Sequence, residues 1–327
     1  MTAPLAVSLM PLETRREAIL RAATGADRLG YDGFFLPETW AHDTTVLLAE
    51  AAVRTTQIRL GSCILGVWGR SAATIAMAAS TLHDISGGRF TLGLGASTAQ
   101  LAEGLHDVPF RVPTDRMRRV ITQVRALLKG ERIPLTTATG ARPLRLNLPP
   151  APDVPIWLAG LAKDSIRLAG ELADGWIPFL YPRSRLVEGK GLLKDGALRA
   201  GAERVVPLIC PSIPTVVAAD ATEARAGAAW FVSFYLTSMG PFYARTISRL
   251  GFEKEVRAVV AANTTRGSAI VPPEADVLLE ELTVYGTPAE ARARLARWQA
   301  AGAELPILLL PPKLEPRQID FALEALR

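Results

Sequence analysis

Short apolar runs alternate with longer segments of helical period from one end of the chain to the other. Continuous apolar runs are typical of buried strands, and apolar positions that recur every three or four residues are typical of helices. The predicted strands are Ala6–Leu9, Gly33–Leu36, Ile58–Ile64, Phe90–Gly95, Ile156–Gly160, Trp176–Phe179, Val206–Ala218 and Leu305–Leu310. The predicted helices are Arg15–Leu29, Thr45–Thr55, Ser71–Ile85, Thr114–Lys129, Lys163–Leu172, Arg183–Ala200, Ala221–Thr237, Thr287–Ala301 and Arg317–Leu326. Strands that alternate with helices in this way indicate parallel βαβ units.

The number of strands favours a (β/α)8 TIM barrel, an α/β fold in which eight parallel strands close into a ring inside a ring of helices. A doubly wound open sheet is the alternative, because strand number alone does not demonstrate closure, although no Gly-x-Gly-x-x-Gly motif opens the first unit. Two segments depart from the repeat: residues 131–155 are rich in Thr and Pro, and residues 239–282 carry Gly, Pro and Asn breaks. We therefore predict one barrel domain over residues 1–327, with insertions after the fourth helix and between strands seven and eight.

Composition narrows the class of protein further. The chain of 327 residues is 49% hydrophobic and 21% charged, which excludes a disordered or fibrous protein. No uncharged apolar run reaches the roughly 18 residues of a membrane-spanning helix, and no basic segment precedes the short apolar stretch near the N-terminus. The two cysteines, Cys63 and Cys210, lie in apolar runs and indicate a reducing compartment. We therefore expect a cytoplasmic protein that is neither secreted nor inserted in a membrane.

The charge balance is basic, with 37 Lys and Arg residues against 32 Asp and Glu residues and a net charge of +5. The basic residues are scattered over the predicted helices, so a continuous surface for nucleic acid is not indicated. Six of the 37 are Lys and the rest are Arg, a residue that suits the recognition of carboxylates and phosphates. A base-composition bias in the genome explains the Arg excess equally well, so the charge alone does not identify a partner.

Side chains that could carry chemistry by themselves are few. The three histidines, His42, His83 and His106, are too far apart for a local metal site, and the chain has neither an HExxH nor a CxxC motif. A nucleophile elbow and a Walker loop are also missing from the sequence. We therefore expect no metal, and these absences favour a cofactor that brings its own chemistry.

Barrel enzymes place their sites beyond the carboxyl ends of the strands. The segments that follow predicted strands two to five are residues 37–43, 63–70, 96–100 and 160–165, and His42 is the one histidine among them. Gly160 ends a strand shortly before a helix begins near Asp164 or Ser165, an arrangement whose free backbone N–H groups attract phosphate. An ordinary turn, in which Asp164 or Ser165 caps its own helix, is the alternative.

Three blocks of sequence resemble the bacterial luciferase-like monooxygenase family. The first block consists of LGSCILG at residues 60–66, AMAASTL at 76–82 and SGGRFTLGLG at 86–95. The second joins VPIWLAGL at residues 154–161 to RLAGELADGW at 167–176, and the third is YGTP at 285–288. The resemblance covers nearly the whole chain and implies the TIM barrel.

Further details are similar to the branch of the family that uses the deazaflavin coenzyme F-420 (8-hydroxy-5-deazaflavin). They are LPETW at residues 36–40 and the segment from Gln100 to HDVPF at residues 106–110. In the sugar-phosphate dehydrogenase relatives, a histidine follows the acidic residue and a glutamate follows the strand-four loop, whereas this chain has Thr39 and Thr98 there. The resemblance therefore implies a reductase or other oxidoreductase and not a dehydrogenase of that type.

Carried onto this chain, the resemblance also implies a cofactor site. It implies a non-prolyl cis peptide at Cys63-Ile64 that presses on the middle of the ring, with Glu38 near the polar end of the ring. The further residues implied to line the ring, ribityl chain and phosphate are Gly66, Ala96, Ser97, Gln100, Ala159, Gly160 and Leu161. The residues implied to line the substrate side are Trp40, Trp68 and Phe179.

The function that the resemblance implies is hydride transfer from reduced coenzyme F-420 to a small organic acceptor, which is an imine, an enone or a carbonyl compound. Glu38 and His42 are the candidate catalytic residues for proton handling. The first alternative is an FMNH2-dependent two-component monooxygenase, and the second is a flavin-binding barrel protein without catalysis. The family suggests a homodimer, and a flavin or deazaflavin reductase in trans would supply reduced cofactor. We expect the second insertion to shape the substrate pocket.

Overall fold

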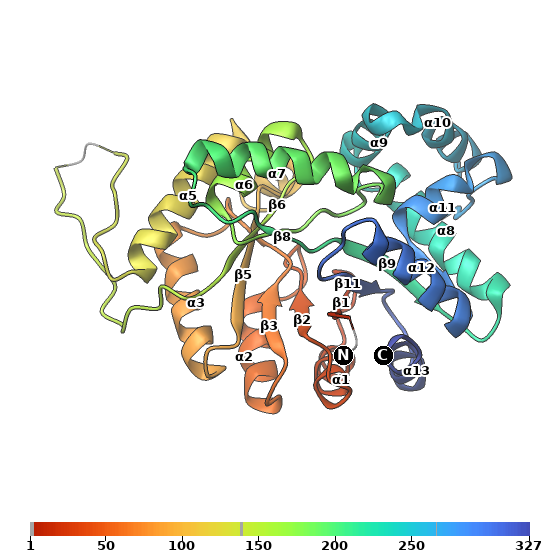
Figure 1. Cartoon of the computed structure of the whole chain (residues 1–327), viewed down its shortest axis with the longest axis horizontal. Helices are drawn as coiled ribbons and strands as arrows, with labels where there is room; N and C mark the ends of the chain where they lie inside the picture. Colours follow the sequence, from red (N-terminus) through yellow and green to blue (C-terminus); the bar gives the residue numbers. More distant parts are fainter. Residues whose placement is uncertain (1–2, 138–139, 266) are drawn as a thin grey trace.

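The strands lie parallel and curl into a barrel with helices around the outside (Figure 1). The structure, a computed structural model, describes residues 3–137, 140–265 and 267–327. The strands are β1 (Ala6–Leu9), β2 (Gly33–Leu36), β3 (Arg59–Ser62), β4 (Leu65–Gly66), β5 (Phe90–Gly95), β6 (Ile156–Ala159), β7 (Gly175–Trp176), β8 (Leu208–Ile209), β9 (Ser212–Val217), β10 (Val284–Gly286) and β11 (Ile307–Leu310).

The helices follow the strands in near-regular alternation. They are α1 (Arg16–Arg28), α2 (Thr44–Arg54), α3 (Ala72–Ile85), α4 (Ala99–Gly104), α5 (Pro113–Leu128), α6 (Lys163–Leu172), α7 (Leu186–Ala200), α8 (Ala221–Thr237), α9 (Pro241–Ile247), α10 (Glu253–Ala262), α11 (Val277–Leu282), α12 (Pro288–Ala300) and α13 (Pro316–Leu326). The short helical turns are η1 (Arg183–Arg185), η2 (Ser248–Phe252) and η3 (Pro273–Ala275).

Several helices begin where the sequence supplies a capping side chain. Asp43 accepts a hydrogen bond from the Thr45 N–H at the start of α2, and Asp220 accepts from two N–H groups at the start of α8. Thr287 and Glu290 form a reciprocal capping box at the start of α12. These side chains accept hydrogen bonds from backbone N–H groups that the first helical turn leaves free. They therefore fix the residues at which the helices begin after the strands.

The sheet closes on itself. β1 pairs with β2 on one side and with β11 on the other, and parallel pairing continues from β2 through β3, β5, β6 and β7 to β8. β9 pairs with β11, and a parallel bridge between Phe179, after β7, and Ser212 of β9 joins the two ends of the sheet. The open, doubly wound alternative is therefore wrong, and the prediction of a TIM-barrel-like α/β fold is confirmed.

Two of the predicted strands are interrupted in the structure. The strand expected over Ile58–Ile64 ends at Ser62 and resumes as β4, and the strand expected over Val206–Ala218 is divided at Pro211. Pro211 has no N–H to donate to the ladder, which accounts for the second break. The sequence analysis also misses β10, a three-residue strand beside the last three residues of β9, because so short a run carries no readable period.

The interior of the barrel is filled by two aromatic rings. Phe35 of β2 and Trp157 of β6 stack with their ring centroids 5.1 Å apart, and smaller apolar residues from the other strands surround them. The rings fit because glycines face them: a Cβ on Gly33 would lie 2.6 Å from the Phe35 ring, and one on Gly175 would lie 2.6 Å from the Trp157 ring. The barrel is therefore a packed core with its open end at the carboxyl ends of the strands.

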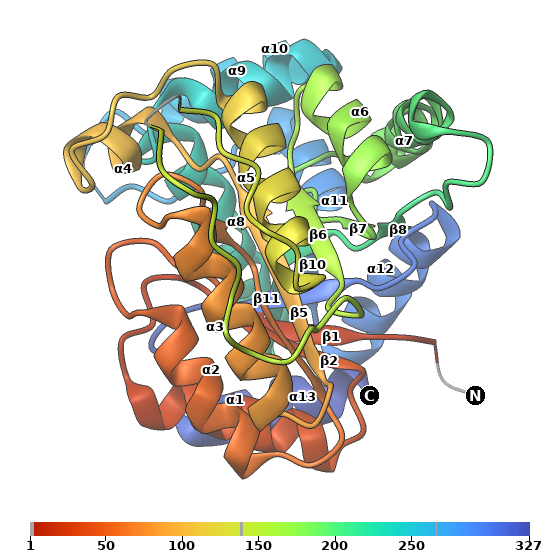
Figure 2. The same ribbon diagram turned by 90° about the vertical axis from the view of Figure 1, so that its left-hand side faces the viewer.

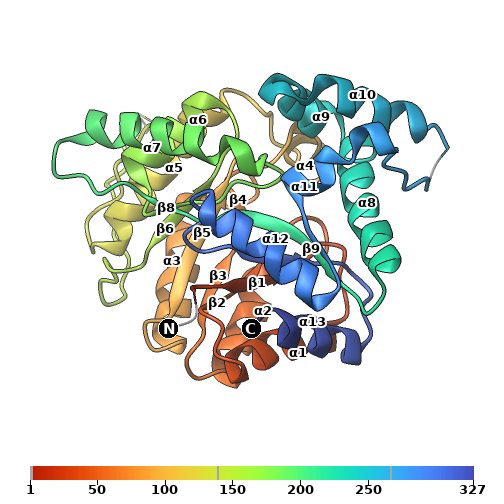
Figure 3. The same cartoon turned by 45° about the vertical axis from the view of Figure 1, so that its right-hand side comes forward.

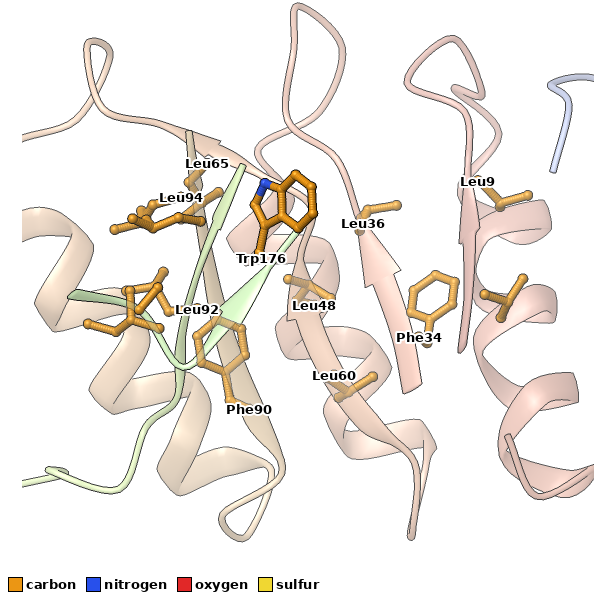
Figure 4. Packing of buried hydrophobic residues seen from close by; sticks show 14 of the residues in the cluster. Leu9, Phe34, Leu36, Leu48, Leu60, Leu65, Phe90, Leu92, Leu94 and Trp176 are labelled. Atoms are coloured by element: carbon orange, nitrogen blue, oxygen red, sulfur yellow. The ribbon is translucent and has the colours of Figure 1, made fainter. Parts of the chain in front are cut away.

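A second layer of apolar side chains lies between the strands and the surrounding helices. Figure 4 shows Phe34 and Leu36 of β2 and Leu60 of β3 beside Leu48 of α2, all in one buried cluster. Phe34 and Leu48 are 0% exposed. Complete burial on both faces explains why these strands are continuous apolar runs in the sequence.

The segment between β9 and β10 carries α8, α9, α10 and α11. Its core contains Phe231 of α8, Val259 of α10 and Leu278 of α11, which join a buried cluster with Met10 and Leu309 of the barrel. In Figures 2 and 3, α9 and α10 stand at the same end of the molecule as α6 and α7. The helices of this segment therefore pack directly on the open end of the barrel.

The segment between α5 and β6 has a different character, because its described residues form neither helix nor strand. It extends outward at the left of Figure 1, and the Ile133 N–H donates to the Leu144 carbonyl across it at 2.8 Å. Within the described part of the chain, no helix has both the length and the apolar character to cross a membrane.

Candidate functional site

Three neighbouring strands end side by side in small residues. Gly66 of β4 pairs with Gly95 of β5, and Gly95 pairs with Ala159 of β6. We call Gly66, Gly95 and Ala159 the small-residue shelf. Gly66 and Ala159 are half-buried and have little or no side chain, so a planar ligand can approach the backbone closely at both, while Gly95 lies between them beneath Ile64.

The residues around the shelf are accessible at the open end of the barrel. Leu65, Leu94 and Leu158, whose side chains face the helices, are at most 1% exposed. The residues that the sequence analysis assigns to cofactor binding at this edge are all half-buried: Cys63, Ile64, Gly66, Ala96, Ser97, Ala159, Gly160 and Leu161. The structure thus brings these eight residues together at the ends of three adjacent strands.

The Cys63-Ile64 peptide bond is cis, as the resemblance implies. The Cys63 N–H donates to the Leu36 carbonyl at 2.9 Å, and the Glu38 N–H donates to the Ile64 carbonyl at 3.3 Å, so both ends of this step are tied to β2. The Ile64 side chain covers Gly95, whose Cβ would lie 2.8 Å from it. Cys63, Ile64 and Ala159 together pack on the barrel interior and form its upper surface.

Neither cysteine has the properties of a reactive thiolate. Burial raises the pKa of the Cys63 thiol to about 12, and a hydrogen bond with Ser212 offsets part of that rise. Burial also raises the pKa of Cys210 well above its ordinary value. Both thiols are therefore neutral at physiological pH, which excludes nucleophilic catalysis by either of them.

The start of α6 leaves backbone donors free beside the shelf. Ala162 is the N-cap residue, and no side chain caps the helix. The Ser165 hydroxyl donates to the Ala162 carbonyl at 2.8 Å, and the Asp164 carboxylate accepts from Arg167 at 3.2 Å. The alternative in which Asp164 or Ser165 caps its own helix is therefore wrong. The N–H groups of the first turn keep their capacity to bind an anion.

Glu38 follows β2 and belongs to a group of paired charges. Arg70 donates through Nε and Nη2 to the two Glu38 carboxylate oxygens, at 3.2 and 2.6 Å, and Nη2 also lies 2.8 Å from Asp43. We call Glu38, Asp43 and Arg70 the charged cluster. Burial would raise the pKa of Asp43, but hydrogen bonds from Thr45 and Arg70 lower it overall. The cluster holds the loops after β2 and β4 together through one guanidinium that is shared by two carboxylates.

Three other predicted site residues lie apart from this cluster. His42 donates through Nε2 to the Thr14 carbonyl at 3.0 Å, so it braces the loop after β1 and makes no hydrogen bond with Glu38 in the described chain. Trp40 is 48% exposed. Gln100 is exposed in the first turn of α4. The structure does not pair the two residues expected to handle protons.

Trp68 is a buried structural residue at the base of the loop after β4. Its indole Nε1 donates to the Ala96 carbonyl at 2.7 Å, and its ring packs against Phe110 with centroids 5.2 Å apart. The Arg116 guanidinium lies 5.5 Å from the Trp68 ring centroid, which is a cation–π distance. Trp68 therefore fixes the β5 end of the shelf through Ala96.

Phe179, which follows β7, belongs to an aromatic group on the opposite side of the shelf from the charged cluster. Its ring lies 4.8 Å from Tyr235 of α8 and 5.6 Å from Tyr243 of α9, both in edge-on contact. The two tyrosine rings are 5.3 Å apart. Phe179 also forms a parallel β-bridge with Ser212, the hydrogen-bond partner of Cys63. We call Phe179, Tyr235 and Tyr243 the aromatic cluster.

The sequence analysis misses four residues that shape this site. They are Arg70, Ser212, Tyr235 and Tyr243. One signal was available for the tyrosines: residues 230–243 hold six aromatic side chains, in a chain that is 6% aromatic. For Ser212 no local signal exists, because its role depends on β9 lying near the loop after β3. In the described ranges, no three His, Cys, Asp or Glu side chains are grouped as a metal site.

The sequence matches a known family over most of its length. The model of the family described as "Luciferase-like monooxygenase" matches residues 3–305. Rv3520c of Mycobacterium tuberculosis, whose name places it among the coenzyme F-420-dependent oxidoreductases, is 30% identical in an alignment of 307 residues that covers 86% of this chain and 88% of that protein. A 5,10-methylenetetrahydromethanopterin reductase of Methanolobus tindarius is 25% identical over 282 residues and 83% of each chain.

Solved structures share the fold at lower identity. The coenzyme F-420-dependent tetrahydromethanopterin reductase of Methanopyrus kandleri superposes with a TM-score of 0.77 and 16% identity, over 100% of this chain and 99% of that one. The oxygenating constituent of 3,6-diketocamphane monooxygenase from Pseudomonas putida, solved with FMN, gives a TM-score of 0.73 and 17% identity, over 100% and 97% of the two chains. The chain belongs to the luciferase-like monooxygenase family and is an oxidoreductase.

Proposed function

We propose that this protein binds the deazaflavin coenzyme F-420 and catalyses hydride transfer from its reduced form to a small organic acceptor, an imine, an enone or a carbonyl compound. The observation that carries the proposal is the small-residue shelf, which is half-open at the barrel mouth beside the uncapped start of α6. The F-420-dependent relative at 30% identity supports the deazaflavin over FMN.

The residues present fit a ring with a phosphate-bearing tail. Gly66, Ala96, Ser97 and Ala159 would line the ring and the ribityl chain, and the space beside Gly66 is open, because a Cβ there would have just one neighbour within 4 Å, at 3.9 Å. Gly160 and Leu161 would lead the tail to the first N–H groups of α6, where a helix terminus favours negative charge. In the loop after β2, the Thr39 hydroxyl is buried without a hydrogen-bond partner among the described residues, so it is free to bond to a ligand.

When bound in its reduced form, the deazaflavin supplies a hydride to an acceptor on its open face. The protein's own part is to orient the two reacting carbons, since positioning alone contributes several orders of magnitude in rate. Cys63 and Ile64 would support the ring from the barrel side with a neutral thiol. Glu38, ion-paired with Arg70, would accept hydrogen bonds from the polar end of the ring. His42, which bonds to the Thr14 carbonyl at the rim of the barrel, would handle protons there.

The test is a fluorescence titration of the purified protein with coenzyme F-420 and, separately, with FMN. We expect F-420 to bind at least about tenfold more tightly than FMN, which corresponds to about 1.4 kcal/mol. A preference for FMN together with oxygen uptake would contradict the proposal and favour the two-component monooxygenase, to which the FMN-bound structural neighbour is related in fold. Binding of neither compound would contradict both enzyme assignments.

The proposal includes a homodimer. Val46 and Val53 on α2 are 66% and 71% exposed, and Met77 and Ile85 on the neighbouring helix α3 are 44% and 41% exposed. Several exposed apolar side chains on adjacent helices support a face that a second copy covers. Light scattering should give twice the mass of the chain, and Val53→Glu should shift it towards the monomer. A monomeric wild type at micromolar concentration would contradict this part of the proposal.

The remaining parts of the proposal concern domain organisation and supply of the cofactor. Residues 1–327 would form one domain, with insertions at about 131–155 and 239–282, and the second insertion contributes Tyr243 to the mouth. A flavin or deazaflavin reductase in trans would supply the reduced cofactor. Limited proteolysis tests the domain assignment: cleavage within residues 131–155 should leave the two fragments associated.

A further inference from the structure

The aromatic cluster has one buried tyrosine, Tyr235, and one half-buried tyrosine, Tyr243, and within the described chain neither hydroxyl forms a hydrogen bond. Tyr235 is 4% exposed, yet within the described chain its hydroxyl makes no hydrogen bond. The Tyr243 hydroxyl likewise has no partner there. Neither oxygen is among the fully enclosed polar atoms, so both retain contact with open space. Buried hydroxyl groups are normally paired, and an unpaired group that faces open space at a site indicates a ligand.

Both tyrosine rings contact Phe179, which is bridged to Ser212 at the start of β9. Ser212 in turn forms a hydrogen bond with the Cys63 thiol. After burial, which is the larger cause, the nearby Cys63 thiol also raises the pKa of both phenols. The two tyrosines therefore lie near Cys63, the residue that the proposed function places beneath the deazaflavin ring.

Within the described chain, no charged side chain forms a hydrogen bond or an ion pair with either hydroxyl. The ionisable group near both hydroxyls is the neutral Cys63 thiol. Arg183 of η1, which follows Phe179 in the chain, is paired with Glu281 of α11 at 3.0 Å. A charged acceptor group placed here would lose its hydration without gaining a counter-ion, which is costly.

From this geometry we infer that Tyr235 and Tyr243 are the acceptor-binding residues, and that the acceptor is an uncharged molecule with an apolar or aromatic body and a carbonyl or imine group. The phenol hydroxyls donate hydrogen bonds to the acceptor's heteroatom, while Phe179 and the tyrosine rings cover its apolar body. This inference rests on the proposed function for the reaction, but the binding site itself exists without the cofactor.

The position of the site agrees with a role in hydride acceptance. A heteroatom held by two phenol donors is polarised, which makes the carbon that receives the hydride a better acceptor, and the donors stabilise the negative charge that develops on the heteroatom. The heteroatom then takes a proton from the Tyr243 phenol, and solvent at the open mouth returns a proton to the phenolate. Glu38 and His42 are already engaged by Arg70 and by the Thr14 carbonyl. The tyrosines therefore supply the hydrogen-bond donors that the charged side of the mouth does not offer.

The test uses two probes that share one body and differ in charge: benzylideneacetone, an uncharged aromatic enone, and cinnamate, its carboxylate counterpart. Calorimetric titration of the full chain without cofactor should show binding of benzylideneacetone and at least about tenfold weaker binding of cinnamate. Tyr235→Phe and Tyr243→Phe should each lower the affinity for benzylideneacetone by about 3- to 10-fold, which corresponds to the loss of one hydrogen bond. Tyr181→Phe is the matched control, because that buried tyrosine packs on Trp176 instead of Phe179.

Each Tyr→Phe change keeps the ring, so the melting temperature and the F-420 affinity of the variants should match the wild type. Unchanged enone affinity in both variants, or equal binding of enone and cinnamate, would overturn the inference. A wild type that fails to bind F-420 but shows the tyrosine-dependent enone binding would contradict the proposed function and leave the acceptor site standing. With reduced F-420 present, enone reduction by Tyr243→Phe should fall by about 100-fold in kcat.

Discussion

At the ends of β2 and β4, the charged side chains all form ion pairs through Arg70, whereas in the aromatic cluster two hydroxyls have no hydrogen-bond partner among the described residues. Arg70 alone contacts both Glu38 and Asp43. Tyr235 and Tyr243 contact aromatic rings and a neutral thiol. The small-residue shelf lies between the two clusters. Polar groups that are satisfied within the protein fix its loops, and polar groups that are left free are available to a ligand.

The origin of the two clusters differs as well. The charged cluster comes from loops that every barrel unit must have, and its residues lie within 33 positions of one another, from Glu38 to Arg70. The aromatic cluster unites the end of β7 with helices α8 and α9, and α9 belongs to the segment between β9 and β10. A barrel of this kind can therefore keep the charged cluster constant and bind a different acceptor when the residues of the aromatic cluster change.

The largest effect is expected from filling the small-residue shelf, which lies between the two clusters and is proposed to bind the cofactor ring. Gly66→Leu places a large side chain where a Cβ meets nothing closer than 3.9 Å, so the fold should tolerate it while the ring is excluded. We expect F-420 affinity to fall by at least about 100-fold, or about 2.7 kcal/mol. Gly191→Leu on the exposed face of α7, where a Cβ would meet nothing within 4 Å, is the control. Equal F-420 affinity in both variants would remove the shelf from the cofactor site.

The charged cluster should be the more important of the two for stability. Arg70→Met leaves the Glu38 and Asp43 carboxylates without their shared partner, and the Glu38 and Arg70 side chains are each just 15% exposed. We expect the free energy of unfolding to fall by about 2–3 kcal/mol in urea titrations. Arg54→Met breaks an exposed ion pair with Glu50 on α2 and should cost less than about 1 kcal/mol. Similar losses in both variants would show that Arg70 is an ordinary surface residue.

The sequence predicts the barrel well because its strands are buried on both faces. Runs such as Ile307–Leu310 are apolar throughout, so the strand appears in the pattern without knowledge of its neighbours. The errors fall where tertiary context decides: β10 is three residues long, and Pro211 divides one apolar run into two strands. Neither the short strand β10 nor the break at Pro211 changes the local hydrophobic pattern enough to be predicted from it.

The site is only partly predictable from the sequence. The cofactor-facing residues follow from the strand ends together with the family resemblance, and the cis peptide at Cys63-Ile64 was expected on that ground. The engagement of Glu38 by Arg70 was not expected, because the two residues are 32 positions apart and meet through loop geometry. The tyrosines were missed for the same reason, since no spacing relates Phe179 to Tyr243.

Titration should separate the two clusters by pH. Burial raises the pKa of all five tyrosines, among them Tyr235 and Tyr243. A free phenol with a pKa of about 10 is roughly 90% ionised at pH 11, so we expect the folded protein to show less than about half of the phenolate absorbance of the denatured chain there. The measurement is absorbance at 295 nm, with circular dichroism to verify the fold.

The sign of the stability change follows from the direction of each shift. A raised tyrosine pKa contributes stability that is present below about pH 10 and is lost as the pH rises through the folded-state value. The lowered pKa of Asp43 contributes stability that is present above its unfolded value and is lost as the pH falls through the folded-state value. Raising the pH should therefore first reduce the contribution of the aromatic cluster to the free energy of unfolding, and lowering the pH should first reduce the contribution of the charged cluster. Full phenolate absorbance in a folded protein at pH 11 would contradict the burial of the tyrosines.

The smallest effect is expected at the rim of the charged side. Trp40 is 48% exposed and makes no ring contact in the described chain, whereas Trp68 is 8% exposed and bonded to Ala96. Trp40→Ala should change the free energy of unfolding by less than about 0.5 kcal/mol, and Trp68→Ala should lower it by about 3 kcal/mol. If Trp40→Ala keeps its stability but loses affinity for benzylideneacetone, Trp40 contacts the bound acceptor. The acceptor site then extends across the shelf from the aromatic cluster to the charged side of the mouth. Unchanged affinity confines it to the aromatic cluster.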